Sequence, residues 1–107
     1  MARPAVHPGK VLAEELASIG VSATELARQL EVPPNRISQI INGKRTITGD
    51  TALRLAHWLK TTPELWLKLQ ADYDLDIARR ASGDRIRCLP TKASGTNTAA
   101  TRGGRGG

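Results

Sequence analysis

Residues 34–45 carry the side chains of this sequence that are best suited to hydrogen bonding with the edges of base pairs. Asparagine and glutamine can bind adenine through two hydrogen bonds, and arginine can bind guanine in the same way. At about 100° per residue along a helix, Asn35, Gln39 and Asn42 fall opposite an apolar stripe at positions 37, 40 and 41, with Arg36 and Ser38 at its flanks. We therefore predict that bases are contacted by Pro34, Asn35, Arg36, Ser38 and Gln39.

A second set of residues around this segment is suited to contacts with phosphate groups. Lys44 and Arg45 follow directly after the expected end of the helix, where the DNA backbone would pass. Ser22 stands at the start of an earlier helix, and the free N–H groups of a helix N-terminus bind anions. The predicted phosphate-contacting residues are Ser22, Thr24, Arg28, Asn42, Lys44 and Arg45.

The other reactive side chains do not form a catalytic or metal-binding pattern. His7 and His57 have no neighbouring ligand residues, and Cys88 is the only cysteine. The carboxylates at 14–15 and 72–76 are typical of solvated helix faces, although the second group is also suited to a basic partner surface. We expect no catalytic residue, metal, cofactor or small-molecule substrate, and an enzyme such as a nuclease is disfavoured.

Five helices are expected to position these residues, and no long alternating pattern indicates a strand. The starts are indicated by prolines and by capping residues, including the box formed by Ser22 and Glu25. The ends are indicated by Gly20 and Gly43, which tolerate the left-handed conformation beyond a helix. The expected helices cover about 8–19, 22–30, 34–41, 48–59 and 62–81. The predicted fold class is therefore all-α.

Length and charge fit one small domain followed by a basic tail. The chain has 107 residues and a formal net charge of +6, of which residues 82–107 carry +4, together with 6 of the 10 glycines. We predict an N-terminal arm over 1–7, a DNA-binding domain over 8–81, and a disordered basic tail over 82–107, with Arg85–Leu89 able to form a strand on a partner. Without a membrane-spanning run or a secretion signal, a cytoplasmic protein is expected.

The segment from about 22 to 43 has the order of a helix-turn-helix motif. A short capped helix, a turn of about three residues and a second short helix with an inward isoleucine stripe are followed by a basic loop. In this motif the second helix lies in the major groove, while the first crosses the DNA backbone. The alternative is a structural bundle with a solvated polar face, but the combination of features favours DNA binding.

The stretch SATELARQLEVPPNRISQIINGKR at 22–45 resembles the XRE, or λ-repressor-like, helix-turn-helix family. The flanking blocks at 7–12, 47–48, 62–67 and 73–75 are similar to those of the HigA type, the antitoxins of type II toxin–antitoxin modules. The resemblance covers about residues 5–79. Glu31 departs from it, because the family usually has glycine in the turn, and a strained or altered turn is expected there.

This resemblance implies a five-helix, λ-repressor-like bundle that forms a homodimer and binds an operator in its own promoter. It also implies that the protein neutralises a cognate HigB-type toxin, an mRNA endonuclease, by direct binding. The alternative is a stand-alone XRE-family transcriptional regulator without a toxin partner. Because the last helix carries apolar residues on more than one side, we expect a dimer seam formed by Leu65, Trp66, Leu69 and Tyr73.

Overall fold

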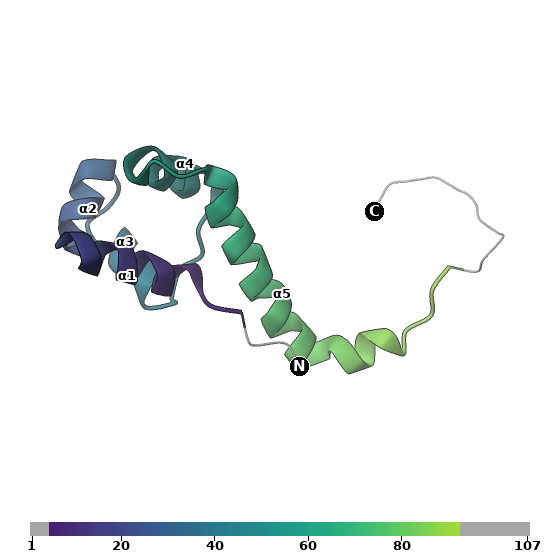
Figure 1. Ribbon diagram of the computed structural model, residues 1–107. Coiled ribbons are helices and arrows are strands. Elements are labelled where there is room, and N and C mark those ends of the chain that lie inside the picture. The colour runs from purple at the N-terminus through teal and green to yellow at the C-terminus, as the bar shows by residue number, and fades with distance from the viewer. Residues whose placement is uncertain (1–4, 93–107) are drawn as a thin grey trace.

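The computed structural model describes residues 5–92, and this part of the chain contains five helices and no strand (Figure 1). The helices are α1 (Pro8–Ile19), α2 (Ala23–Leu30), α3 (Arg36–Ile41), α4 (Gly49–Leu59) and α5 (Pro63–Arg87). The expected all-α helix-turn-helix bundle is therefore confirmed. The remainder of the predicted arm and tail, 1–4 and 93–107, lies outside the described residues. No helix among those described is long and apolar enough to cross a membrane.

Side-chain caps start three of the five helices, of which the sequence predicts those at Ser22 and Thr62, whereas it indicates the start of α1 by Pro8 and not by His7. Each cap accepts a hydrogen bond from one of the first N–H groups of its helix, which have no partner within the helix. The capping atoms are His7 Nδ1, Ser22 Oγ and Thr62 Oγ1, which accept from the N–H groups of Gly9, Glu25 and Leu65 at 2.9, 3.0 and 3.2 Å. Local hydrogen bonding thus fixes where α1, α2 and α5 begin.

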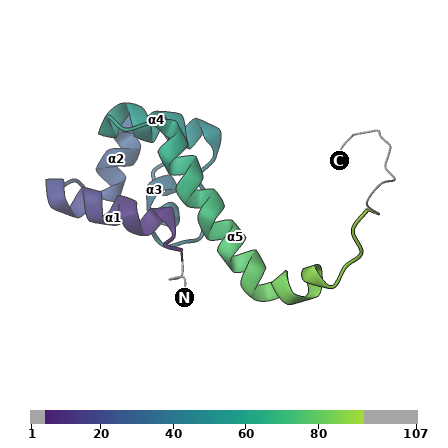
Figure 2. The same ribbon diagram turned by 45° about the vertical axis from the view of Figure 1, so that its right-hand side comes forward.

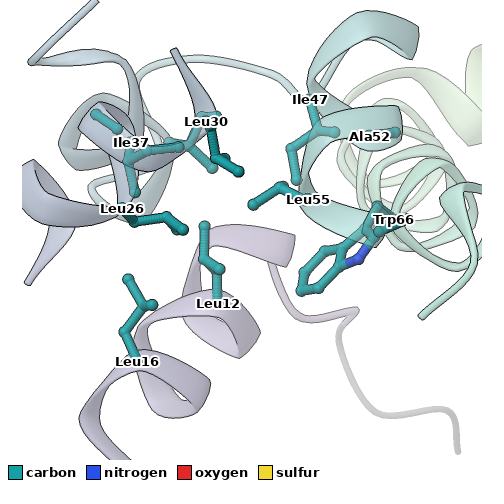
Figure 3. Close-up of a cluster of buried hydrophobic side chains, with 12 residues drawn as sticks. Leu12, Leu16, Leu26, Leu30, Ile37, Ile47, Ala52, Leu55 and Trp66 are labelled. Carbon is teal, nitrogen blue, oxygen red and sulfur yellow. The ribbon is translucent and has the colours of Figure 1, made fainter. Parts of the chain in front are cut away.

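A core of aliphatic side chains and one tryptophan holds the helices together (Figure 3). Trp66 is 1% exposed, and its indole N–H donates to the hydroxyl of Thr61 at 2.9 Å, so that the polar atom of this core residue has a partner. The core includes residues from all five helices and from the loop before α4. Its members are Leu12, Leu16, Leu26, Ala27, Leu30, Ile37, Ile40, Ile47, Ala52, Leu55, Ala56 and Trp66.

The helix-turn-helix pair α2–α3 packs against α1 and α4, and α5 runs from α4 past α1 and out of the bundle (Figures 1 and 2). The buried amide of Gln70 ties α5 to the loop before α4, because its Oε1 accepts from the N–H of Ile47 at 2.8 Å. The Arg54 guanidinium ties α4 to α2 by donating to the carbonyl of Leu30 at 2.7 Å. These bonds fix the motif relative to the long helix.

Two helix boundaries differ from the expectation. The third helix begins at Arg36, not at Pro34, because Pro34 and Asn35 form a turn before it. The fifth helix continues to Arg87, six residues beyond its expected end at 81. Residues 82–87, assigned to the disordered tail, are therefore helical, and residues 85–87 of the segment expected to form a strand on a partner lie in the last turn of α5. In the last turns of α5 the helix changes direction (Figure 1), and the pair Ser82-Gly83 has the composition that allows such bends.

Candidate nucleic-acid interface

The turn of the motif begins with a residue in the left-handed conformation. Glu31 has φ 59° and ψ 46° at the end of α2, and the next residue, Val32, donates its N–H to the carbonyl of Ala27 at 3.1 Å. This conformation favours glycine, since a Cβ crowds the following carbonyl oxygen at a cost of roughly 1–2 kcal/mol. The turn at Glu31 is thus strained, as the departure from the family pattern predicts.

A second turn directly precedes α3. The N–H of Arg36 donates to the carbonyl of Pro33 at 2.9 Å, so that Pro34 and Asn35 are its two central residues. Asn35 has φ −93° and ψ 2°, the values of the third position of a type I turn, in which proline is favoured one position earlier. The side chain of Asn35 makes no capping bond and is exposed. Its amide therefore lies free at the N-terminus of α3.

Helix α3 buries one face and presents the other to solvent. Ile37 and Ile40 are 0% exposed. Arg36, Ser38 and Gln39 are half-buried, and the Ser38 hydroxyl donates to the carbonyl of Asn35 at 3.1 Å. Of the predicted base-contacting residues, Pro34 and Asn35 thus lie in the turn and the other three on the helix.

The loop after α3 returns alongside the helix. Gly43 has φ 75°, and its N–H donates to the carbonyl of Ile40 at 3.0 Å, while the N–H of Lys44 donates to that of Gln39 at 2.8 Å. This pair of bonds is a Schellman motif, which reverses the chain after a helix. The reversal brings the Arg45 side chain to Gln39, where Nε donates to Oε1 at 2.9 Å. That contact links a predicted phosphate residue to a predicted base-contacting residue.

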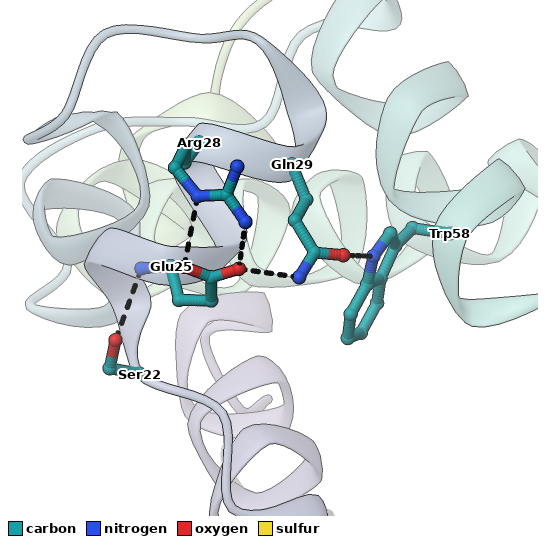
Figure 4. Close-up of polar contacts among 5 residues, drawn as sticks. All are labelled: Ser22, Glu25, Arg28, Gln29 and Trp58. Atoms are coloured by element: carbon teal, nitrogen blue, oxygen red, sulfur yellow. Dashed lines mark hydrogen bonds and ion pairs between the residues drawn. The ribbon is translucent and has the colours of Figure 1, made fainter.

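A network on α2 engages one of the predicted phosphate residues (Figure 4). Arg28 donates to Glu25 from Nε at 3.0 Å and also from Nη2, and Gln29 donates to the same carboxylate at 2.6 Å. The Arg28 guanidinium, followed by the Gln29 amide, lowers the pKa of Glu25 to about 2. The amide of Gln29 is held in turn by the indole N–H of Trp58, which donates to Oε1 at 2.7 Å.

The remaining predicted phosphate residues lie at helix ends and in the loop. Ser22 and Thr24 are exposed at the start of α2, and the hydroxyl oxygen of Ser22 accepts the capping bond. Asn42 is the exposed C-cap of α3, and Lys44 is exposed in the loop. The sequence-predicted residues thus occupy the start of α2, the turn before α3, its solvent face and the loop after it.

A family model described as helix-turn-helix matches residues 12–66, which include this entire arrangement. The chain belongs to the XRE-like helix-turn-helix family. This family comprises DNA-binding regulators and antitoxins rather than enzymes. Among the relatives of this XRE-like chain, virulence-associated protein I of Dichelobacter nodosus is 46% identical over 78 residues, which are 72% of each protein.

Solved structures show which members of the family this chain is similar to. An addiction module antidote protein of the HigA family from Coxiella burnetii has 48% identity and a TM-score of 0.81, and the match covers 85% of this chain and 100% of that one. The antitoxin HigA of Pseudomonas aeruginosa, solved with the higBA promoter, has 33% identity and a TM-score of 0.78 with the same coverage. The resemblance to the HigA type is confirmed.

The expected dimer residues are not a single free surface of this XRE-like fold. Trp66 belongs to the core and is not available for a seam, which corrects its assignment. Leu69 packs against the same core, and the ring of Tyr73 makes an edge-on contact with that of His7 at 4.8 Å between centroids. Only Leu65, at 42% exposure, is largely free. The face of α5 on which most of these residues lie is therefore already packed against the rest of the helical bundle.

The structure also contains features that sequence analysis missed. An open groove of about 300 Å³ lies between the end of α2 and α4, and none of its lining residues is among the predicted DNA contacts. Leu53, 62% exposed, and the half-buried Trp58 provide its apolar walls. The contact between Gln29 and Trp58 joins positions 29 residues apart, for which one sequence gives no signal. Within residues 5–92 no three His, Cys, Asp or Glu side chains are grouped as metal ligands.

Proposed function

We propose that this protein is an operator-binding repressor of its own promoter that uses α3 to contact bases in the major groove. The single observation that carries the proposal is the geometry of α3. Its inward isoleucines fix the helix in the bundle, while Asn35 and Gln39 are left at the N-terminal turn and on the outer face. The N-terminal residues of the second helix contact base edges in helix-turn-helix complexes.

Local charge and the relatives support the same function. Lys44 and Arg45 lie in the loop after α3 and are exposed, so their cations flank the residues proposed to contact bases. A similar antitoxin has been solved with promoter DNA, and antitoxin GraA, 39% identical, has been solved with its operator. A dimer would place two copies of α3 about 34–36 Å apart on a nearly palindromic site.

The experiment begins by selecting duplexes from a random pool with the full-length protein. Binding of the selected duplex and of random DNA is then compared for the wild type, Asn35→Ala and Lys44→Ala. We expect Asn35→Ala to lose about 1–3 kcal/mol on the selected duplex and to relax preference at one position. Lys44→Ala should weaken all sequences alike and reduce the salt slope by about 1. Equal losses on both duplexes for Asn35→Ala would contradict base contact by Asn35.

We further propose that the protein neutralises a HigB-type toxin, an mRNA endonuclease, by direct binding. This proposal is supported by similarity to proteins named as antitoxins, including one from Vibrio cholerae that is 38% identical over 74 residues. Both operator and toxin binding would take place in the cytoplasm. The groove between α2 and α4 and the acids at 72–76 provide surfaces apart from the predicted DNA contacts.

Co-expression with the short reading frame beside this gene tests the proposal. If that neighbour arrests growth alone, and if this chain binds it in a pull-down and restores growth, the antitoxin function is supported. Leu53→Asp and an Asp72→Lys variant then determine whether the groove or the acidic segment contacts the toxin. A harmless or non-binding neighbour would favour the alternative of a stand-alone XRE-family regulator, with DNA binding unchanged.

We propose a homodimer that uses the face of α5 opposite to the core. Leu67, Ala71, Leu75 and Ala78 follow one another at intervals of four, four and three residues, and all four are exposed. This spacing lines up on one side of a helix, whereas the buried Trp66 and Gln70 lie on the other. The small alanines would let two copies of α5 approach closely. The spacing was present in the sequence, but only the structure separates it from the core face.

A further inference from the structure

We propose that Gln39 and Arg45 act as one unit in which Arg45 orients the amide that contacts a base. The inference rests on the operator-binding function proposed above and deepens it. In this arrangement Arg45 positions Gln39 for base contact, in addition to any contact that Arg45 makes with phosphate. The arrangement also specifies the kind of base edge to which Gln39 binds.

The fold brings the two residues together through the Schellman motif. The bond from the Lys44 N–H to the Gln39 carbonyl, at 2.8 Å, closes the loop onto the last turn of α3. Gly43 makes this closure possible, because its φ of 75° is disfavoured for a residue with a Cβ. The chain therefore returns to Gln39 six residues later, with Arg45 beside it. Their contact follows from a backbone structure and not only from two mobile side chains.

The hydrogen bond between them fixes which end of the amide is free. Arg45 Nε donates to Gln39 Oε1 at 2.9 Å, so the oxygen is held by a cation and the amide nitrogen is the end left without a partner in this contact. A charged donor makes a shorter and stronger hydrogen bond than a neutral one. It also polarises the amide, which strengthens the remaining N–H groups as donors. Gln39 is therefore prepared to donate to the DNA.

The chemistry of the major groove then limits the partner. Guanine presents N7 and O6 as acceptors, adenine presents N7, and thymine presents O4, whereas cytosine presents only an amino donor. An amide whose nitrogen faces the groove is therefore matched to the first three bases and mismatched with cytosine. The two terminal nitrogens of the Arg45 guanidinium are not used in the bond to Gln39. They remain able to contact a phosphate or a guanine next to this position.

The test compares base preferences, because a residue that contacts only phosphate does not change them. Duplexes carrying each of the four bases at every position of the selected site are bound to full-length wild type, Gln39→Ala, Arg45→Ala, Arg45→Lys and the double Ala variant. Lys44→Ala is the matched control, since it removes a neighbouring cation and leaves the contact with Gln39 intact. Circular dichroism of each variant establishes that it is folded.

We expect the wild type to disfavour cytosine at one position, and Gln39→Ala to reduce that preference by roughly 5- to 100-fold. Arg45→Ala should reduce the preference at the same position by about two- to tenfold. Arg45→Lys should lose the same preference while it keeps the salt dependence of binding. The double variant should lose no more preference than Gln39→Ala alone. Lys44→Ala should weaken all duplexes alike and leave every preference unchanged.

Three other results would overturn the inference, and they can be distinguished. If Arg45→Ala weakens all duplexes equally, as Lys44→Ala does, Arg45 contacts only phosphate and positions nothing. If Gln39→Ala changes no preference while the wild type still selects a sequence, the pair does not contact a base, and operator binding itself stands. If the wild type selects no sequence at all, the proposed operator function fails, and the inference fails with it.

Discussion

At Gly9 the backbone of α1 lies directly against the backbone of α3. A Cβ at this position would be 1.9 Å from the carbonyl oxygen of Ile40 and 2.7 Å from its carbonyl carbon. Real Cβ atoms do not approach other atoms so closely, and the obstacle is backbone, which cannot rotate away as a side chain can. The distance between α1 and the helix that carries the predicted base contacts therefore depends on a single missing methyl group.

Replacing Gly9 with alanine should lower the free energy of unfolding by about 1–3 kcal/mol, because the two helices must separate. Urea denaturation of the full-length protein measures this change. Gly49→Ala is the matched control, since it lies at the start of α4 with no atom within 4 Å of its Cβ position. The control should keep the wild-type stability or gain about 0.5–1 kcal/mol from the reduced flexibility of alanine. A Gly9→Ala protein as stable as the control would contradict the close packing.

Glu25 should titrate far below an ordinary glutamate. The Arg28 guanidinium, followed by the Gln29 amide, stabilises the ionised carboxylate, and the pKa of Glu25 falls to about 2. Because the folded-state value is the lower one, any stabilisation from this network is present above the usual glutamate pKa and is lost as the pH falls toward 2. The carboxyl carbon shift of Glu25, followed by NMR from pH 6 to pH 1.5, measures the midpoint.

The variant Arg28→Ala should raise the pKa of Glu25 toward its usual value of 4.5, because it removes the largest stabilising contact. Arg80→Ala removes a comparable ion pair with Asp76 on α5 and should leave the Glu25 midpoint where it is. A wild-type midpoint near 4.5 would mean that Arg28 is free in solution. It would then be available for the phosphate contact that the sequence predicts.

At the scale of the helices, sequence analysis succeeded where local hydrogen bonding decides the outcome. The start of α1 was indicated by Pro8, the starts of α2 and α5 follow from caps that act within three residues, and the ends of α1 and α3 follow from Gly20 and Gly43. The buried apolar stripe of α3 and the half-buried polar residues outside it were likewise predictable from a period of 3.6 residues. These signals are contained in short stretches of sequence.

The boundaries that were missed depend on competition between similar local structures. Proline is favoured both at the first position of a helix and at the second position of a turn, and Pro34 adopts the turn. The end of α5 was placed before Ser82-Gly83, a pair of weak helix formers, yet the helix continues through it. Arg87 near the helix end and its pairing with Asp84 favour that continuation. The contact between Gln39 and Arg45 required the three-dimensional loop.

Replacing Gln70 with leucine should test how α5 is joined to the motif. Gln70 is 5% exposed and supplies the acceptor for the buried N–H of Ile47. Leucine fills similar space but leaves that N–H without a partner, so the free energy of unfolding should fall by about 1–3 kcal/mol. The amide of Ile47 should also exchange its hydrogen faster, as measured by NMR.

The control for this change is Asp74→Ala, which removes the other partner of the Gln70 amide at 3.0 Å. Asp74 is exposed, so its loss should alter stability by no more than about 0.5 kcal/mol. If Gln70→Leu and Asp74→Ala have the same small effect and the Ile47 amide remains protected, the joint between α5 and the loop is not the buried hydrogen bond.

At the scale of the whole molecule, the two faces of α5 have different surroundings, since one is buried and the other is exposed. One face completes the core near its N-terminal end, and the opposite face carries the stripe of Leu67, Ala71, Leu75 and Ala78. The helix also extends beyond the bundle, so its far part has no body to cover it (Figure 2). Leu75 and Ile77 are each 48% exposed, but they point to opposite sides of the helix. This pair allows the proposed seam to be tested with exposure held constant.

Leu75→Asp should separate the proposed dimer into monomers, because two buried carboxylates would face each other across the symmetric seam. Ile77→Asp introduces the same charge at the same exposure on the other side and should leave the dimer intact. Sedimentation over a range of protein concentrations measures the association of both variants. On DNA, Leu75→Asp should weaken binding to a duplex with two half-sites and leave binding to a single half-site unchanged. If both variants dissociate equally, or if neither does, the stripe on α5 is not the seam, and the two copies of α3 must be held on the operator by another surface.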